Sequence, residues 1–161
     1  MATTHSAVDV KDIEEIRLLF LEYQSEIGVD LCFQGFANEL ATLPGEYSPP
    51  SGRLLLTVDG NAAIGCVALR ALSNANCEMK RLYVRPAARG RGIGELLARG
   101  VLSAARQIGY KRIFLDTLPS MSAARALYHS LGFTEAPPYC HNPVPGVSYL
   151  ALDLGIAAPL E

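Results

Sequence analysis

The stretch Arg89-Gly90-Arg91-Gly92-Ile93-Gly94 constrains this chain more than any other. A strand-like run, 77–84, precedes it, and a run with helical spacing, 95–108, follows it. Glycines let a backbone pass close to an anion, and the first N–H groups of a helix have no partner inside that helix. The helix dipole adds about 0.3–1 kcal/mol for an anion at that end. The order of strand, glycine-rich turn and helix therefore predicts a phosphate-binding corner.

Charge and composition argue against several kinds of partner. The 161 residues carry a formal net charge of −2, which gives no general reason to bind nucleic acid. No apolar run approaches the ~20 residues of a membrane span, and residues 1–5 do not begin a signal peptide. The four cysteines show no CxxC or other metal spacing, so we expect free thiols, no metal and a cytoplasmic location.

Hydrophobic periodicity predicts one domain, 1–161, with a loose tail over 155–161 and at most a short edge strand at 6–8. Asp9 and Gly28 bound the first expected helix, and a shorter helix follows over 31–42. The expected order then is strands 53–59, 62–69 and 77–84, a helix to 108, a strand 111–117, a helix 120–131 and strands from 133 and over 147–154. The hairpins predict antiparallel pairs and the strand–helix–strand unit predicts a parallel crossover.

Two segments together carry a family resemblance. One runs from Leu82-Tyr83-Val84-Arg85-Pro86 into the glycine-rich stretch; the other is Ala124-Arg125-Ala126-Leu127-Tyr128-His129-Ser130-Leu131-Gly132-Phe133. At this separation they resemble the GNAT superfamily of acyl-CoA-dependent N-acetyltransferases. The alternative for the glycines alone is a dinucleotide site. That site requires GxGxxG and an acidic residue about 20 positions later, and this chain lacks the spacing.

The resemblance implies an α/β fold, an α+β arrangement in which helices flank a splayed, mostly antiparallel mixed sheet with acetyl-CoA in its cleft as the acyl donor. In the family the end of the third strand, here Leu82, Tyr83 and Val84, pairs with the pantetheine arm like an added strand. The pyrophosphate would lie against Arg89, Gly90, Arg91, Gly92, Ile93 and Gly94. Many members have an asparagine where this chain has Met121, so that cofactor contact stays unassigned.

Two residues are candidates for proton transfer. Acetylation requires a neutral amine, which costs on the order of 4–5 kcal/mol for a lysine-like amine at pH 7 and about 1 kcal/mol for an α-amino group. The resemblance places a base at Glu78, which alternation groups on one face with Lys80 and Leu82. Glu78 could instead pair with Lys80 or an arginine, and His141 could serve as the base. Tyr128 is the candidate acid for the leaving thiolate, or else a core aromatic residue.

The acceptor site is predicted from polar residues in the regions that the superfamily uses for it. The candidates are Phe33, Gln34, Glu39, Asp116 and Asn142. The acidic side chains among the candidates favour a cationic acceptor, such as an amino acid, a polyamine or another small amine.

Three functions remain open at this point. The first is transfer of acetyl to the primary amine of a small, cationic molecule by direct attack in a ternary complex, since no cysteine has a recognisable histidine partner in the sequence. The second is acetylation of protein N-termini or lysines. The third is an acyl-CoA-binding sensor without turnover. An exposed strand edge could support a homodimer.

Overall fold

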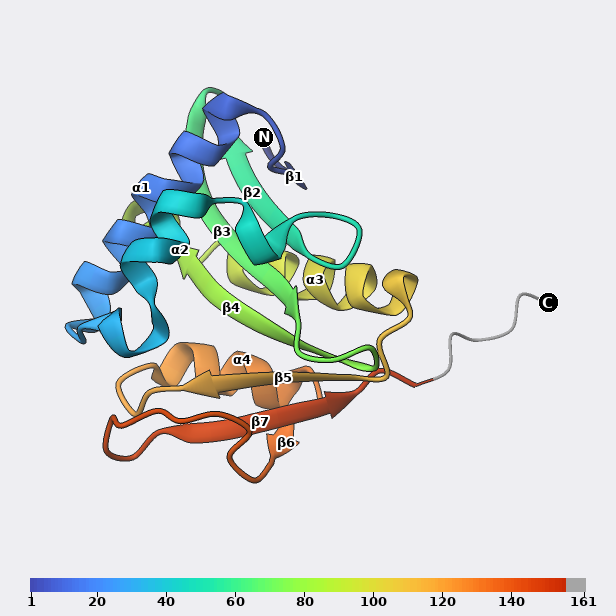
Figure 1. Cartoon of the computed structure of the whole chain (residues 1–161). Helices are drawn as coiled ribbons and strands as arrows, with labels where there is room; N and C mark the ends of the chain where they lie inside the picture. The colour runs from blue at the N-terminus through green and yellow to red at the C-terminus, as the bar shows by residue number, and fades with distance from the viewer. Residues whose placement is uncertain (156–161) are drawn as a thin grey trace.

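The computed structural model describes residues 1–155, and its centre is one seven-stranded sheet in the order β1-β2-β3-β4-β5-β7-β6 (Figure 1). The strands are β1 (Ala2–Ser6), β2 (Arg53–Asp59), β3 (Ala62–Ala71), β4 (Asn76–Val84), β5 (Arg112–Thr117), β6 (Thr134–Glu135) and β7 (Ser148–Asp153). The α-helices are α1 (Val10–Ile27), α2 (Phe36–Thr42), α3 (Ile93–Ile108) and α4 (Ser122–Ser130). Short 3-10 helices are η1 (Leu31–Gln34), η2 (Gly45–Tyr47) and η3 (Pro86–Ala88). The predicted α/β class with a mixed sheet is confirmed.

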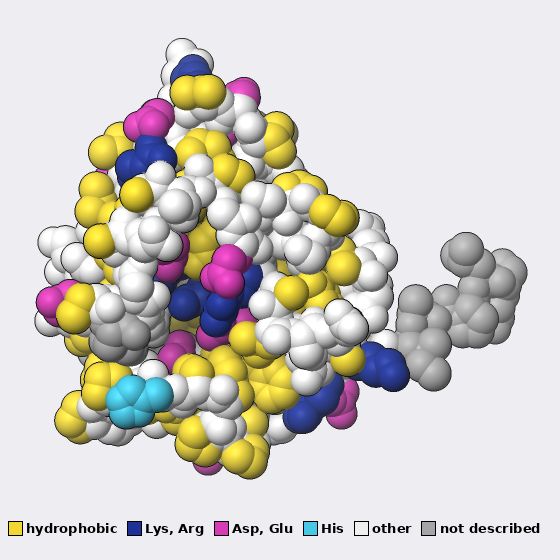
Figure 2. Space-filling view, viewed as in Figure 1, with side chains coloured by type: hydrophobic (Ala, Val, Ile, Leu, Met, Phe, Trp, Pro, Cys, Tyr) yellow, Lys and Arg dark blue, Asp and Glu magenta, His cyan; other side chains and the backbone are white. Residues whose placement is uncertain are grey.

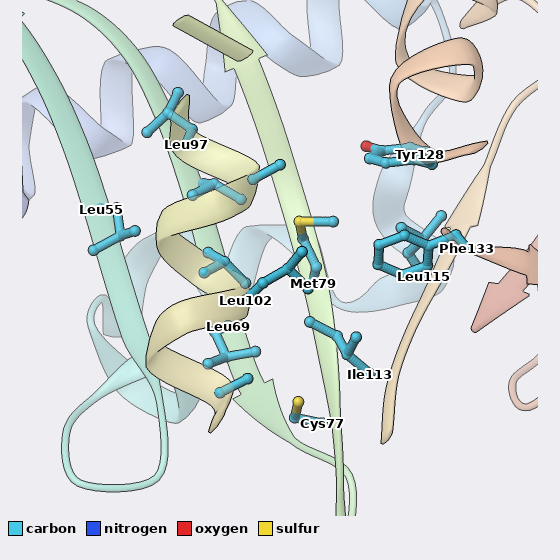
Figure 3. Packing of buried hydrophobic residues seen from close by; sticks show 14 of the residues in the cluster. Leu55, Leu69, Cys77, Met79, Leu97, Leu102, Ile113, Leu115, Tyr128 and Phe133 are labelled. Atoms are coloured by element: carbon cyan, nitrogen blue, oxygen red, sulfur yellow. The ribbon is translucent and has the colours of Figure 1, made fainter. Parts of the chain in front are cut away.

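Helices on both faces give the sheet two hydrophobic cores. On one face, α1 buries Ile16, Leu19 and Phe20 against β2 and β3. On the other, α3 packs against β2, β3 and β4, and Figure 3 shows its Leu97 and Leu102 in that core. The ends of α1 match the sequence, because the Asp9 side chain accepts a hydrogen bond from Asp12 N and Gly28 adopts a left-handed conformation.

The sheet splays between β4 and β5, as the resemblance implies. These parallel strands pair at only three positions, from Asn76 opposite Arg112 to Glu78 opposite Phe114. Beyond Glu78 the two strands diverge, so the last six residues of β4 have no strand partner on the β5 side (Figure 1). A strand with unpaired backbone groups can accept an extended ligand along its edge.

A bulge in β4 overturns the predicted alternation. Cys66 of β3 pairs with Tyr83 and Ala68 pairs with Lys80, so β4 contains one extra residue between these pairs. The extra residue is Arg81, whose φ of 62° lies in the left-handed region. The bulge reverses the side-chain alternation, so Leu82 packs with Met79 in the α3 core. The prediction that Leu82 shares a face with Glu78 is therefore wrong.

Other boundaries differ locally from the prediction. The helix expected over 31–42 is divided into η1 and α2 at Gly35, whose φ of 69° interrupts a helix. The first strand is Ala2–Ser6 rather than 6–8, and it forms an edge of the sheet by pairing with β2. In the described range, 1–155, no helix is both long and apolar enough to span a membrane. Apart from Gly155, the predicted loose tail lies outside the described residues.

Candidate active site

A cleft of about 460 Å³ opens where β4 ends and α3 begins. It is bounded by α1, the start of α4 and the loop between η3 and α3. The predicted cofactor residues that line it are Leu82, Tyr83, Val84, Arg89, Gly90, Gly92, Ile93 and Gly94. Arg91 does not line the cleft, because its guanidinium turns to Asp59 at 3.0 Å. Met121 does line it, between Ser120 and Ser122.

The loop before α3 has the geometry of an anion cradle. Gly90 and Gly92 have φ of 81° and 77°, a left-handed conformation that favours glycine. Along the described backbone, Arg89 N donates to Pro86 O and Leu96 N donates to Gly92 O, whereas no acceptor is recorded for the N–H groups of residues 90–95. Successive free N–H groups at a helix start bind phosphate oxygens, so this cradle fits the pyrophosphate of acetyl-CoA.

The arginines at this corner are already paired with carboxylates. Arg89 lies 2.6 Å from Glu26, and its Nε donates to Val84 O at 2.9 Å. Arg85 lies 2.7 Å from Glu22. A phosphate group at this corner would therefore rely on the backbone N–H groups and would share Arg89 with Glu26.

A small cavity of about 30 Å³, called the junction below, shares lining residues with this cleft and with a second, polar cavity. It shares Leu82 and Met121 with the cofactor cleft, and Gln34, Lys80 and Asp116 with the polar cavity. Tyr128 and Asn142 also line it. The reacting ends of a donor in one cleft and an acceptor in the other would meet at this junction.

Tyr128 reaches the junction from the α3-side core. Its ring packs on Phe133 with centroids 5.8 Å apart, and only 5% of the residue is exposed. Its hydroxyl points toward β4 in Figure 3 and has no hydrogen-bond partner recorded in the described chain. Burial raises the pKa of Tyr128, so the phenol keeps its proton across the physiological range. Tyr128 thus combines the expected core packing with a hydroxyl available to a ligand.

The polar cavity holds about 350 Å³ between α2, η2, β3, β4 and the loop that follows β6. Figure 2 shows basic and acidic side chains gathered in a hollow at the centre of this face. Of the predicted acceptor residues, Gln34, Glu39 and Asp116 line the cavity, and Asn142 lines the adjoining junction. Phe33 lies in η1, and its side chain is outside the described part of the structure.

Glu78 lies in the wall of this cavity at the point where β4 and β5 separate. It is 2% exposed, and both of its carboxylate oxygens have donors. Arg70 Nε donates to Oε1 at 2.7 Å, and the Tyr139 hydroxyl donates to Oε2 at 2.5 Å. Glu78 therefore pairs with an arginine, as the alternative interpretation of the sequence allowed, and this pair is largely buried. Each oxygen can accept a further hydrogen bond, so these donors and the burial restrict the approach of a proton to Glu78 without occupying every acceptor position.

The other two acidic candidates have different partners. Glu39 accepts two hydrogen bonds from Arg81, at 3.0 and 2.8 Å, so its charge is offset within the fold. Asp116 accepts from Asn142 Nδ2 at 3.1 Å and lies 3.8 Å from the Cys140 thiol. No cation pairs with Asp116 in the described residues. Asp116 is thus the carboxylate in the cavity with the most freedom to hold an ammonium group.

Sequence reasoning missed two basic residues in this cavity, Arg70 of β3 and Lys80 of β4. Arg70 also lies 3.1 Å from Glu46, which is exposed. Lys80 lines both the cavity and the junction, has no ion-pair partner among the described residues, and has a pKa lowered mainly by desolvation. A usable signal was present for Arg70, which is the one charged residue of an otherwise apolar strand, whereas Lys80 lies in a strand that also contains Glu78 and Arg81.

The cysteine thiols near the site are not activated as nucleophiles. Burial raises the pKa of Cys77 to about 12, and burial with the nearby Asp116 carboxylate raises that of Cys140 to about 11. Cys66 is fully buried, which also raises its pKa. The thiolate is the reactive form, so these residues are poor acyl carriers. The described residues contain no group of three or more potential metal ligands.

Comparison with known sequences identifies a family. The model of the acetyltransferase (GNAT) family matches residues 13–133. An uncharacterized N-acetyltransferase of Schizosaccharomyces pombe is 41% identical over 146 residues, covering 89% of this chain and 90% of that protein. The N-acetylaspartate synthetase of Rattus norvegicus is 34% identical over 136 residues, covering 81% of this chain and 45% of that longer protein.

Solved structures share the fold at lower identity. A GNAT-family acetyltransferase from Staphylococcus aureus superposes with a TM-score of 0.80 at 19% identity, covering 96% of this chain and all of that one. A Salmonella typhimurium protein solved with its cofactor acetyl-CoA gives a TM-score of 0.68 at 21% identity, covering 98% of this chain and 96% of that one.

Proposed function

The chain belongs to the GNAT family and is an acetyl-CoA-dependent N-acetyltransferase, and we propose that it acetylates the primary amine of a small molecule by direct attack in a ternary complex. One observation carries the proposal: two clefts of different chemistry meet at the junction beside Tyr128. The free N–H groups before α3 suit the donor's phosphates, and the polar cavity suits an amine.

Bound acetyl-CoA supplies a thioester carbonyl as the acyl source. Asp116 and Gln34 line both the polar cavity and the junction, so their oxygens would orient an amine toward the cofactor cleft. Tyr128 would donate a hydrogen bond to the departing sulfur. Its buried phenol is a weaker acid than a thiol, whose ordinary pKa is about 8.5, so hydrogen bonding stabilises the thiolate more readily than full proton transfer does.

The acceptor must lose a proton before it attacks. We propose that Glu78 receives this proton, either through a water molecule or as Tyr139 moves aside, because both of its oxygens have donors in the fold. His141 lines the same cavity and is the second candidate. The raised thiol pKa of Cys77 and Cys140 supports direct attack over an acyl-enzyme.

An amine enters this cavity as an ammonium ion, which matches the predicted cationic acceptor. The cavity volume of about 350 Å³ suits a small molecule. The related rat protein is named for making N-acetylaspartate, which supports amino acids as the first acceptors to try.

The experiment is a CoA-release assay with acetyl-CoA and panels of amino acids, polyamines, aminoglycosides and peptides. We expect turnover with small amines, and intersecting lines when the donor and acceptor concentrations are varied together. Parallel lines would exclude direct attack. Turnover only with peptides would establish protein acetylation instead, and binding of acetyl-CoA without any CoA release would establish a sensor.

The Glu78→Gln variant tests the base. We expect its turnover to fall, because the glutamine amide cannot take up the proton that the acceptor amine loses. Unchanged turnover across the pH range would remove Glu78 from the mechanism, and a matched His141→Gln variant would then show whether His141 carries the proton.

A further inference from the structure

The charges of the polar cavity are only partly matched within the protein. Glu39 is neutralised by Arg81, while Glu46 and Glu78 share Arg70. Two charged groups remain without an ionic partner in the described chain, the Lys80 ammonium and the Asp116 carboxylate. Both line the cavity and the junction. A charged group that has lost much of its hydration is costly unless something pairs with it, so this arrangement favours a ligand with charges of both signs.

We propose that the acceptor is an amine that also carries a carboxylate, an amino acid in the broad sense, and that Lys80 binds the carboxylate. The ammonium group lies toward Asp116 and Gln34. This inference rests on the proposed function and specifies its substrate class.

Gln34 supplies a second, independent observation. Its Oε1 atom is buried and has no hydrogen-bond donor, the one such side-chain atom in the described chain. Gln34 lines both the cavity and the junction, so a ligand N–H group could satisfy this acceptor. An ammonium group has three donors, enough for Gln34 and Asp116 together.

Arg70 provides further positive charge on the carboxylate side. Its Nη1 is held by Glu46, whose side chain is 73% exposed and which an incoming carboxylate could replace. Arg70 Nε would keep its hydrogen bond to Glu78 Oε1. Lys80 shares the cavity face with Glu78 by regular strand alternation, and the bulge after it places Arg81 against Glu39 of α2.

Binding the carboxylate also prepares the amine for attack. A carboxylate within the acceptor favours the charged form of its own amine. Lys80 and Arg70 offset that negative charge, which makes loss of the ammonium proton easier. A polyamine would bring only positive charge next to Lys80, so it is the less suitable member of the predicted cationic class.

The test compares each amino acid with its own amide, which keeps the amine and removes the charge of the carboxylate. With the wild-type protein we expect kcat/KM for the acid to exceed that for the amide by about tenfold or more. Lys80→Met should raise KM for the acid by about tenfold and remove the preference over the amide. Lys80→Arg should retain the preference, and Lys111→Met, at an exposed lysine, should behave as wild type.

The outcomes separate this inference from the proposed function. Wild-type turnover of amides or simple amines at rates equal to the acids would overturn the carboxylate site while leaving small-amine acetylation intact. An unchanged acid preference in Lys80→Met would also overturn it. No CoA release with any small amine would instead contradict the proposed function.

Discussion

At the residue scale, the two proposed catalytic side chains lie in opposite surroundings. Tyr128 is surrounded by apolar groups and has a free hydroxyl, whereas Glu78 is held by Arg70 and Tyr139. Removing a buried tyrosine hydroxyl that has no hydrogen-bond partner costs the protein little free energy of unfolding. Removing the Tyr128 hydroxyl should therefore lower turnover strongly while changing stability little.

Tyr128→Phe should lower kcat by about 100-fold and leave KM for acetyl-CoA nearly unchanged, because the hydroxyl acts mainly as charge develops on sulfur. Steady-state kinetics and thermal unfolding measure both effects. The matched control is Tyr110→Phe, since the Tyr110 hydroxyl donates to Ser51 O at 2.7 Å. It should lose about 1 kcal/mol of stability and keep its kcat. Equal kcat values for Tyr128→Phe and Tyr110→Phe would show that the Tyr128 hydroxyl has no part in catalysis.

We expect the free energy of unfolding to depend on pH through Lys80. Desolvation lowers its pKa, so below the lowered value both folded and unfolded chains hold the proton and the cost of burying the charge is fully present. Between the lowered value and the ordinary one, the unfolded chain binds more protons and stability rises with pH. Lys80→Met should therefore be more stable than wild type at pH 7, and the gap should narrow as the pH rises toward the ordinary lysine pKa of about 10.4.

Urea unfolding at pH 7 and pH 10 measures this gap, with Lys111→Met as the exposed control. A gap that stays constant with pH would assign the gain to packing of the methionine side chain rather than to removal of a desolvated charge.

At the element scale, the bulge in β4 and the short helix α2 are joined by one ion pair. The side chains of Arg81 and Glu39 are 2% and 12% exposed. The Arg81 guanidinium also lies 5.1 Å from the centre of the Phe36 ring of α2. This pair attaches α2 to the sheet and so shapes one wall of the polar cavity. The sequence predicts that Glu39 contacts the acceptor substrate, and in the structure its carboxylate pairs with Arg81.

Glu39→Gln should destabilise the fold by about 3 kcal/mol, because it leaves the Arg81 charge buried without its partner. Asp153→Asn is the control, since it removes the exposed pair with Arg112 and should cost about 0.5 kcal/mol or less. Chemical denaturation of both variants gives the comparison. A Glu39→Gln variant of wild-type stability but with a much higher acceptor KM would restore Glu39 as a substrate contact.

At the scale of the whole molecule, the cleft that we propose for acetyl-CoA lies along the part of β4 that has separated from β5 beyond Glu78. A ligand along the free edge of β4 would bridge β4, α1, α3 and α4. Binding that occurs only in the folded state raises stability by mass action. The homodimer stays a prediction, with β1 as one edge strand that could pair with another copy.

CoA at about 100 times its Kd should stabilise the protein by about 2.7 kcal/mol and raise Tm by roughly 5–10 °C. Pantetheine at the same concentration lacks the phosphates that the N–H groups of residues 90–95 would bind, so its shift should be much smaller. Differential scanning fluorimetry measures both. Equal shifts would locate the affinity in the strand edge and contradict the phosphate cradle.

The sequence by itself determined the family, the mixed sheet and the glycine-rich turn before α3, because these depend on local signals: apolar periodicity, the Asp9 and Gly28 caps, and the glycines themselves. Only the tertiary structure decided the polar cavity that we propose for the acceptor. Its charges come from α2, η2, β3, β4 and β5, and their balance depends on which groups pair across the fold. The bulge at Arg81 shows the reason most clearly: one inserted residue reverses the face of Leu82, and spacing along the chain does not reveal it.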